Sequence, residues 1–109
     1  MTDDQEFQKR ADEALEQLYR RLAAAADHHE IEVDFNAGAL AIEFEDPPAK
    51  FVISPNSPVR QIWVSALTRS FKLSWDTARA TFVLPDTGES LNELLAGAVS
   101  KQLGETVTL

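Results

Sequence analysis

The sequence contains no cysteine, and this absence excludes disulfides, thiol nucleophiles, thiolate metal sites and cysteine-ligated iron–sulfur clusters. It also lacks any apolar run near the roughly 20 residues that a membrane-spanning helix needs, so we expect no membrane partner. The chain starts with polar and acidic residues, unlike a signal or transit peptide, and we expect a cytoplasmic protein. Lysine and arginine are few and unclustered, which argues against nucleic-acid binding.

Basic residues are scarcest in the first part of the chain. Residues 1–46 hold thirteen acidic and four basic side chains, whereas residues 47–109 hold five and six, so the net charge of −8 belongs to the first part. Such asymmetry draws cations or basic surfaces, although a well-solvated acidic surface is the usual interpretation. A hydrophobic fraction of 44% is ordinary for a folded protein. The length of 109 residues predicts a single domain over 1–109.

Hydrophobic periodicity predicts a helix, about six strands and a second helix. Apolar residues at steps of three and four indicate a helix over 5–26, and Thr2 with Gln5 forms a candidate capping box at its start. A second helix follows the turn that ends in Ser90, and Gly104 stops it. This order favours an α+β fold, a two-layer α/β sandwich with both helices packed on one face of an antiparallel sheet. Alternation and turn residues place the strands over 30–36, 40–45, 50–54, 60–65, 70–75 and 80–84.

The first two strands predict an acidic hairpin. A loop at Ala37-Gly38 gives a consistent core face, with Phe35 opposite Leu40, Val33 opposite Ile42 and Ile31 opposite Phe44. The same register places Glu32 opposite Glu43 and Glu30 opposite Glu45 on the other face, where like charges destabilise the pairing. We expect a carboxylate patch without internal compensation, made of Glu30, Glu32, Asp34, Glu43 and Glu45.

A bound cation would offset this repulsion. The donors are all oxygen, which suits hard cations, and iron and other divalent cations are candidates. The surface is open rather than a cage, so we expect weak binding of low selectivity. Two alternatives stay open: a docking face for a basic protein partner, and a solubilising face that resists aggregation.

Two further features stand beside the patch. His28 and His29 precede the hairpin, but neighbouring residues in an extended chain point apart, which favours exposed loop histidines over a metal site. In the strand over 60–65, alternation places Gln61, Trp63 and Ser65 on the open face and puts Arg60 with the inward positions, at the strand edge. An exposed tryptophan beside glutamine is a candidate binding hot spot. The alternative is an indole that lies flat over its neighbours.

These features together resemble the frataxin family, in its bacterial CyaY branch, over nearly the whole chain. The specific part is the stretch Pro58-Val59-Arg60-Gln61-Ile62-Trp63. Supporting parts are the early helix with Phe7, Ala11 and Asp12, the hairpin from Glu30 to Phe44, and the segments 87–95 and 104–107. The resemblance implies weak surface binding of Fe²⁺ or Fe³⁺ and a role in iron–sulfur cluster assembly. It implies a cysteine desulfurase and the cluster scaffold protein as partners, and the family is credited with both iron donation and regulation of assembly.

The resemblance also implies which residues carry these roles. The strand part of the metal-binding ridge is Glu30, Glu32 and Asp34, with Asp27 just before it. The helix candidates for the ridge are Asp3, Asp4, Asp12, Glu13 and Glu16. The partner-binding positions are Glu30, Glu32, Asp34, Gln61 and Trp63.

One departure from the family pattern concerns the end of the first helix. Many bacterial members carry a dense carboxylate run there, whereas this chain has Tyr19-Arg20-Arg21 followed by leucine and alanines. The ridge is therefore sparser, which favours electrostatic docking over high-capacity iron storage. The alternative function is an acidic interaction module without a specific metal role. We do not expect an enzyme such as a ferroxidase, because the carboxylates spread over an exposed face instead of converging in a pocket.

Overall fold

The computed structural model describes residues 4–45 and 48–109. The predicted capping box at Thr2 lies outside these residues, as do Asp3 and Asp46, and the side chain of Asp4 is not described. The elements run in the order α1 (Asp4–Ala26), β1 (Ile31–Asn36), β2 (Ala39–Glu45), β3 (Pro48–Asn56), a short 3₁₀ helix η1 (Ser57–Val59), β4 (Gln61–Ala66), β5 (Arg69–Asp76), β6 (Thr81–Val83) and α2 (Leu91–Leu103).

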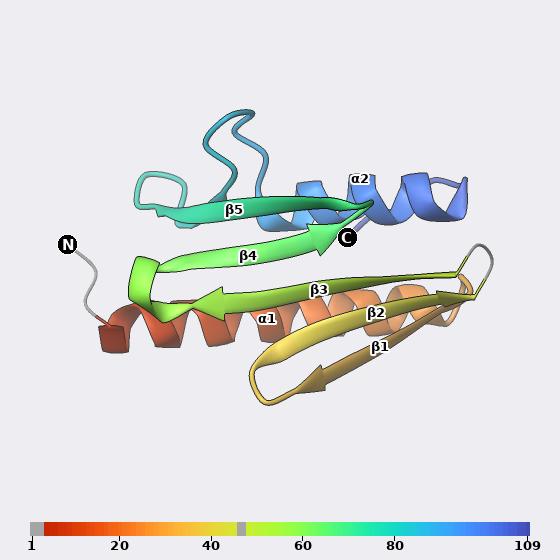
Figure 1. The fold of residues 1–109 in the computed structure, drawn as a ribbon, viewed down its shortest axis with the longest axis horizontal. Helices are drawn as coiled ribbons and strands as arrows, with labels where there is room; N and C mark the ends of the chain where they lie inside the picture. Colours follow the sequence, from red (N-terminus) through yellow and green to blue (C-terminus); the bar gives the residue numbers. More distant parts are fainter. Residues whose placement is uncertain (1–3, 46–47) are drawn as a thin grey trace.

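The strands form one sheet in the order β1-β2-β3-β4-β5-β6, and every neighbouring pair is antiparallel. Both helices lie behind the same face of this sheet, α1 behind the β1–β3 side and α2 behind the β4–β5 side (Figure 1). This is the two-layer α+β sandwich that the sequence predicts. Because no described element covers the other face in the view of Figure 1, strand residues that point away from the helices form an open surface.

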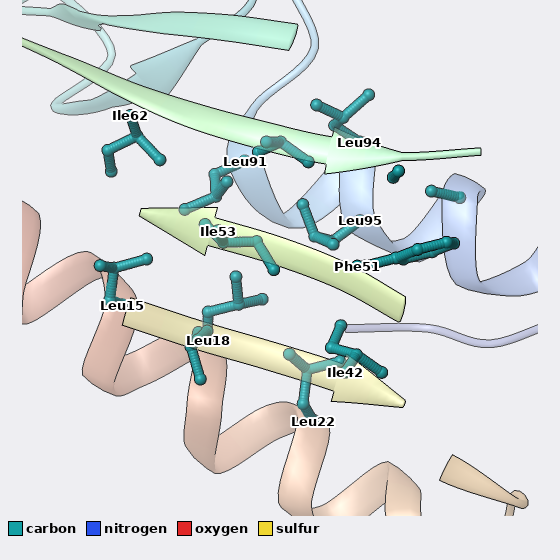
Figure 2. Packing of buried hydrophobic residues seen from close by; sticks show 14 of the residues in the cluster. Leu15, Leu18, Leu22, Ile42, Phe51, Ile53, Ile62, Leu91, Leu94 and Leu95 are labelled. Atoms are coloured by element: carbon teal, nitrogen blue, oxygen red, sulfur yellow. The ribbon is translucent and has the colours of Figure 1, made fainter. Parts of the chain in front are cut away.

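The core fills the space between the helices and the sheet. Leu22 of α1 lies beside Ile42 of β2, with Leu15 and Leu18 further along the same helix, while leucines of α2 lie beside Ile53 and Phe51 of β3 on the same face of the sheet (Figure 2). These residues are buried because the apolar stripe of α1 recurs every three or four positions, which puts its members on one helix face. Alternate residues of each strand complete the core, as the period of two requires.

An aromatic cluster fixes the first half of α1 against the far edge of the sheet. Phe7 meets Phe82 of β6 edge to face, with ring centroids 6.0 Å apart, and Trp75 of β5 meets Phe82 at 5.2 Å. The guanidinium of Arg10 lies 4.4 Å from the Trp75 ring. Aromatic pairs add roughly 0.5–1.5 kcal/mol each beyond the area they bury, so this cluster holds the first half of α1 at the β6 edge of the sheet.

Two predicted strand boundaries need correction. The strand predicted over 50–54 extends over Pro48–Asn56, and Pro55 is tolerated because the β2 ladder already ends at Leu40–Ile53, so no partner on that side needs its missing N–H. Arg60, predicted to share the inward face of β4, lies outside that strand in a left-handed conformation with φ of 51° after η1. The alternation of β4 thus starts at Gln61, and the predicted facing of Gln61, Trp63 and Ser65 is confirmed.

The second helix begins and ends as the sequence predicts. The Ser90 hydroxyl accepts the backbone N–H of Glu93, and the Glu93 carboxylate accepts the backbone N–H of Ser90, which completes a capping box. That backbone hydrogen bond, together with the Ser90 hydroxyl and the nearby Arg79, lowers the pKa of Glu93. Gly104 ends the helix with φ of 72°. Beyond it, Val107 is buried, and its backbone N–H donates to the Ser100 hydroxyl at 2.9 Å.

The two-residue loops of two hairpins adopt positive φ at both positions, and one of these loops contains no glycine. The β1–β2 loop is Ala37-Gly38, as predicted, with φ of 54° and 80°. The β4–β5 loop, Leu67-Thr68, has φ of 54° and 61° and contains no glycine. Positive φ strains a β-branched residue, so Thr68 carries a backbone cost that the hairpin geometry imposes.

Thr68→Gly is expected to raise the free energy of unfolding by about 0.5–1 kcal/mol. Glycine removes the strain of positive φ, and this gain exceeds its extra entropy in the unfolded chain. Urea denaturation should show a higher midpoint with an unchanged slope.

The matched control is Thr77→Gly, in the exposed β5–β6 turn, where φ is not positive. Glycine should lower the stability there. If both variants lose stability equally, Thr68 is not strained.

Candidate metal and protein docking surface

The acidic hairpin forms in the predicted register. Ile31 pairs with Phe44, Val33 with Ile42 and Phe35 with Leu40. Glu32 lies directly opposite Glu43 on the open face. Four carboxylates of the hairpin point away from the core, so the sheet presents them at its β1–β2 edge: Glu32, Asp34, Glu43 and Glu45.

The predicted pairing of Glu30 with Glu45 is wrong in its detail. β1 begins at Ile31, and Glu30 lies in the bend before it, so the ladder does not include Glu30. The turn after α1 extends through Glu30, so the strand starts only at Ile31. The two residues nevertheless line one shallow hollow of about 470 Å³, together with Glu32 and Glu43. Asp34 does not line this hollow.

The expectation that the patch lacks internal compensation is also wrong. Lys50 of β3 pairs with Glu43 in the β2–β3 ladder, and its Nζ lies 4.0 Å from Glu43 Oε1. Lys50 lines the same hollow. The register across three strands decides this contact, whereas the sequence pattern predicted only the first two strands in register.

The helix acids do not join the hairpin acids. Asp12, Glu13 and Glu16 are exposed on α1, in the helix layer, while the hairpin carboxylates point to the opposite face of the sheet. Asp12 accepts the side-chain amide of Gln8 at 2.9 Å, and Glu16 pairs with Arg20 at 2.6 Å. Within residues 4–45 and 48–109, no three histidine, aspartate or glutamate side chains gather closely enough to hold a metal ion.

The loop after α1 differs from its prediction at one histidine. Asp27, His28, His29 and Glu30 line a second hollow of about 510 Å³. Although His28 is exposed, His29 is only 19% exposed at its side chain, and its Nδ1 lies 2.6 Å from Oε1 of Glu105. No local sequence pattern indicates Glu105 as a partner of His29, because 76 positions separate the two residues.

Trp63 lies on the open face as predicted, and it is 38% exposed. Its indole N–H donates to Gln61 Oε1 at 3.0 Å, and the ammonium of Lys72, its register partner on β5, lies 5.0 Å from the ring. The ring therefore has its polar group satisfied and its orientation fixed while part of its apolar surface stays accessible. A hollow of about 400 Å³, lined mainly by apolar atoms, adjoins it between Val52 and Lys72.

Comparisons with known proteins indicate the family to which this chain belongs. The model of the frataxin-like domain matches residues 1–105. The iron-sulfur cluster assembly protein CyaY of Cupriavidus metallidurans is 32% identical over 108 residues, which cover 97% of this chain and 95% of that protein. The protein of the same name from Azotobacter vinelandii is 30% identical over 95 residues, covering 85% of this chain and 86% of that protein.

Solved structures agree with the sequence comparisons. Frataxin from Psychromonas ingrahamii superimposes with a TM-score of 0.78 at 26% identity, covering 98% of this chain and 97% of that chain. Trimeric frataxin from Saccharomyces cerevisiae gives a TM-score of 0.72 at 25% identity, covering 88% and 80%. The helix-covered antiparallel sheet of this chain, with its acidic edge, is thus a frataxin-like domain. The chain belongs to the frataxin family, in its bacterial CyaY branch.

Within the described residues, neither helix is both long enough and apolar enough to cross a membrane.

Glu32→Lys is expected to raise the free energy of unfolding by about 0.5–1 kcal/mol at low ionic strength. The substitution replaces repulsion of the directly opposite Glu43 by attraction. Thermal or urea unfolding measures the change, which should fade at about 1 M salt because exposed charges are screened.

Asp34→Lys is the matched control, because Asp34 lies opposite the uncharged Ala41 and should gain less. Equal gains in the two variants would show that overall charge, and not the Glu32–Glu43 pair, limits stability.

Proposed function

We propose that this chain is an iron-binding accessory protein of iron–sulfur cluster assembly. In this role it docks on the complex of cysteine desulfurase and scaffold protein, and it regulates cluster assembly or supplies iron to it. The observation that carries the proposal is the row of closely spaced carboxylates at the β1–β2 edge, in a chain that matches CyaY assembly proteins over nearly its full length. The same proposal places the protein in the cytoplasm, as the sequence predicts.

The charge distribution supports docking on a basic partner. Glu32 and Glu43 remain directly opposite each other although this arrangement costs stability, and Asp34 and Glu45 extend the same exposed edge. Complementary charge raises the rate of association and selects orientation, even where each exposed pair adds only about 0.2–1 kcal/mol. A partner that brings arginine or lysine to this edge would remove the repulsion.

The open face supplies a second contact of a different kind. Trp63 stays partly exposed with its indole N–H already bonded to Gln61, so docking buries apolar ring surface without leaving a polar group unpaired. Tryptophan is among the residues most enriched in binding hot spots. The acidic edge would then steer and orient the partner, and the Trp63 region would supply much of the affinity.

Iron is the cargo in this role, and we propose that single carboxylates of the open surface bind it without forming a closed site. The glutamates of the first hollow, Glu30, Glu32, Glu43 and Glu45, offer oxygen donors, which suit hard cations such as Fe³⁺ and also bind Fe²⁺. Carboxylates spread on an exposed surface keep most of their hydration, so binding should be weak. We propose the remaining acidic residues as additional low-affinity positions: Asp27, Asp12, Glu13 and Glu16.

The same proposal assigns no catalytic step to this chain: the desulfurase and the scaffold perform the chemistry. The alternative function is an acidic interaction module that binds metals without specificity. It is favoured by the ion pairs and hydrogen bonds that already occupy Asp12 and Glu16 on α1.

The double variant Glu32→Lys/Asp34→Lys is expected to bind a bacterial cysteine desulfurase about tenfold or more weakly at low salt. Two reversed charges convert attraction into repulsion at the edge of the interface. Titration calorimetry at several ionic strengths measures the loss, which should shrink as salt increases.

Trp63→Ala should weaken binding to the complex of cysteine desulfurase and scaffold protein. Because the lost contact is apolar, the loss of affinity should not shrink as salt increases.

The control carries the same charge change elsewhere: Asp86→Lys/Glu89→Lys, in the loop before α2, should bind normally. Normal binding by the hairpin variant would eliminate docking through this edge.

Fe²⁺ added without oxygen is expected to shift or broaden the NMR amide signals of residues 30–34 and 43–45 before those of α2. Carboxylates that bind a paramagnetic ion lie within a few ångströms of these amides. A parallel reconstitution of clusters on the scaffold, with and without the protein and across iron concentrations, separates the two proposed roles.

Unchanged spectra at millimolar iron would eliminate the metal part of the proposal and leave the interaction module. If iron alters neither the affinity for the desulfurase nor the rate of reconstitution, the same conclusion follows.

A further inference from the structure

The hollow lined by Glu30, Glu32, Glu43 and Glu45 already contains a positive charge of the protein itself, the ammonium group of Lys50. Lys50 is the direct register partner of Glu43, and its Nζ lies 4.0 Å from the Glu43 carboxylate. Glu45, which pairs with Pro48, is a diagonal neighbour of Lys50 across the same two strands, within reach of a long side chain. Lys50 and four glutamates line one hollow.

We propose that Lys50 is an internal competitor that sets the affinity of this hollow for the basic side chains of a protein partner that docks on the acidic edge. The inference rests on the proposed function, because both concern the same carboxylates. An external cation gains the attraction of the glutamates only to the extent that the Lys50 ammonium withdraws or is repelled.

Because Lys50 and Glu43 are both exposed, Lys50 can compete with an external cation but cannot block the hollow. The side chain of Lys50 is 58% exposed and that of Glu43 is 49% exposed, so water solvates both charges and the contact is easily broken. The lysine stem has several rotatable bonds and can move its ammonium into solvent without disturbing β3. Lys50 therefore weakens binding by a finite factor and does not close the hollow.

The lining of the hollow adds a steric component. Phe44, Pro48 and Ala49 contribute apolar atoms beside the glutamates, in a space of about 470 Å³. A lysine or arginine from a partner can lay its methylenes along such a surface and place its charge among the carboxylates. Lys50 competes for that arrangement in volume as well as in charge.

Lys50→Gln is expected to bind a cysteine desulfurase about three- to tenfold more tightly than the unmodified protein at low salt. One unit charge removed at about 5–8 Å in a solvated site has an effect of this size. The gain should disappear near 0.5 M salt because of screening. Lys50→Arg keeps the charge and should bind like the unmodified protein.

The matched control is Lys9→Gln, which makes the same change of net charge on an exposed position in the first half of α1, in the other layer. It should leave the affinity for the desulfurase within about twofold, since its charge is remote from the acidic edge and screened. Amide spectra and thermal unfolding of each variant establish that the fold is intact.

The outcomes separate this inference from the proposed function. Tighter binding by Lys50→Gln alone supports the inference. Equal tightening by Lys9→Gln, or normal binding by Lys50→Gln, overturns it and leaves docking through the acidic edge in place. If neither the unmodified protein nor Lys50→Gln binds the desulfurase, the inference and the docking part of the proposed function both fail.

Discussion

The rest of the structure depends on one constraint: two amphipathic helices bury their apolar stripes against the same face of one sheet. Leu15, Leu18 and Leu22 of α1 and Leu95 of α2 are fully buried there. Most inward positions of the strands are consequently committed to the core, and the outward positions are released from it. The released face can carry repelling carboxylates and a partly exposed tryptophan, because the hydrophobic burial that stabilises the fold lies in the other layer.

The functional surface therefore consists of the outward-facing alternate residues of the strands. Pairing between strands decides which charges lie side by side on it. Glu32 beside Glu43 raises the local negative potential, and Lys50 beside Glu43 lowers it. The ammonium of Lys72 lies over the Trp63 ring from the neighbouring strand in the same way, while Gln61 of the same strand accepts the indole N–H. Neighbours across strands, rather than neighbours along the chain, decide how strongly this face attracts a cation or a basic partner.

Periodicity predicted the fold class, the element order and the hairpin register, because a period of two or of 3.6 is a local property that one burial pattern enforces. It missed the contacts that depend on distant segments. Lys50 compensates Glu43 only through the third strand, and His29 meets Glu105 from the other end of the chain. Strand ends at Glu30 and Arg60 also differed, since turn geometry, not hydrophobic pattern, decides where pairing starts.

The strictly sequential strand order has a consequence for how the chain folds. Each strand pairs with the one before it, so the whole sheet can grow by closing short loops, each of which costs little chain entropy. The contact of α1 with β6 is different: Phe7 must find Phe82, and the first five strands lie between them in the sequence. Closing this contact costs more chain entropy than closing a hairpin, which places the packing of the start of α1 against β6 among the slower steps of folding and the hairpins among the faster ones.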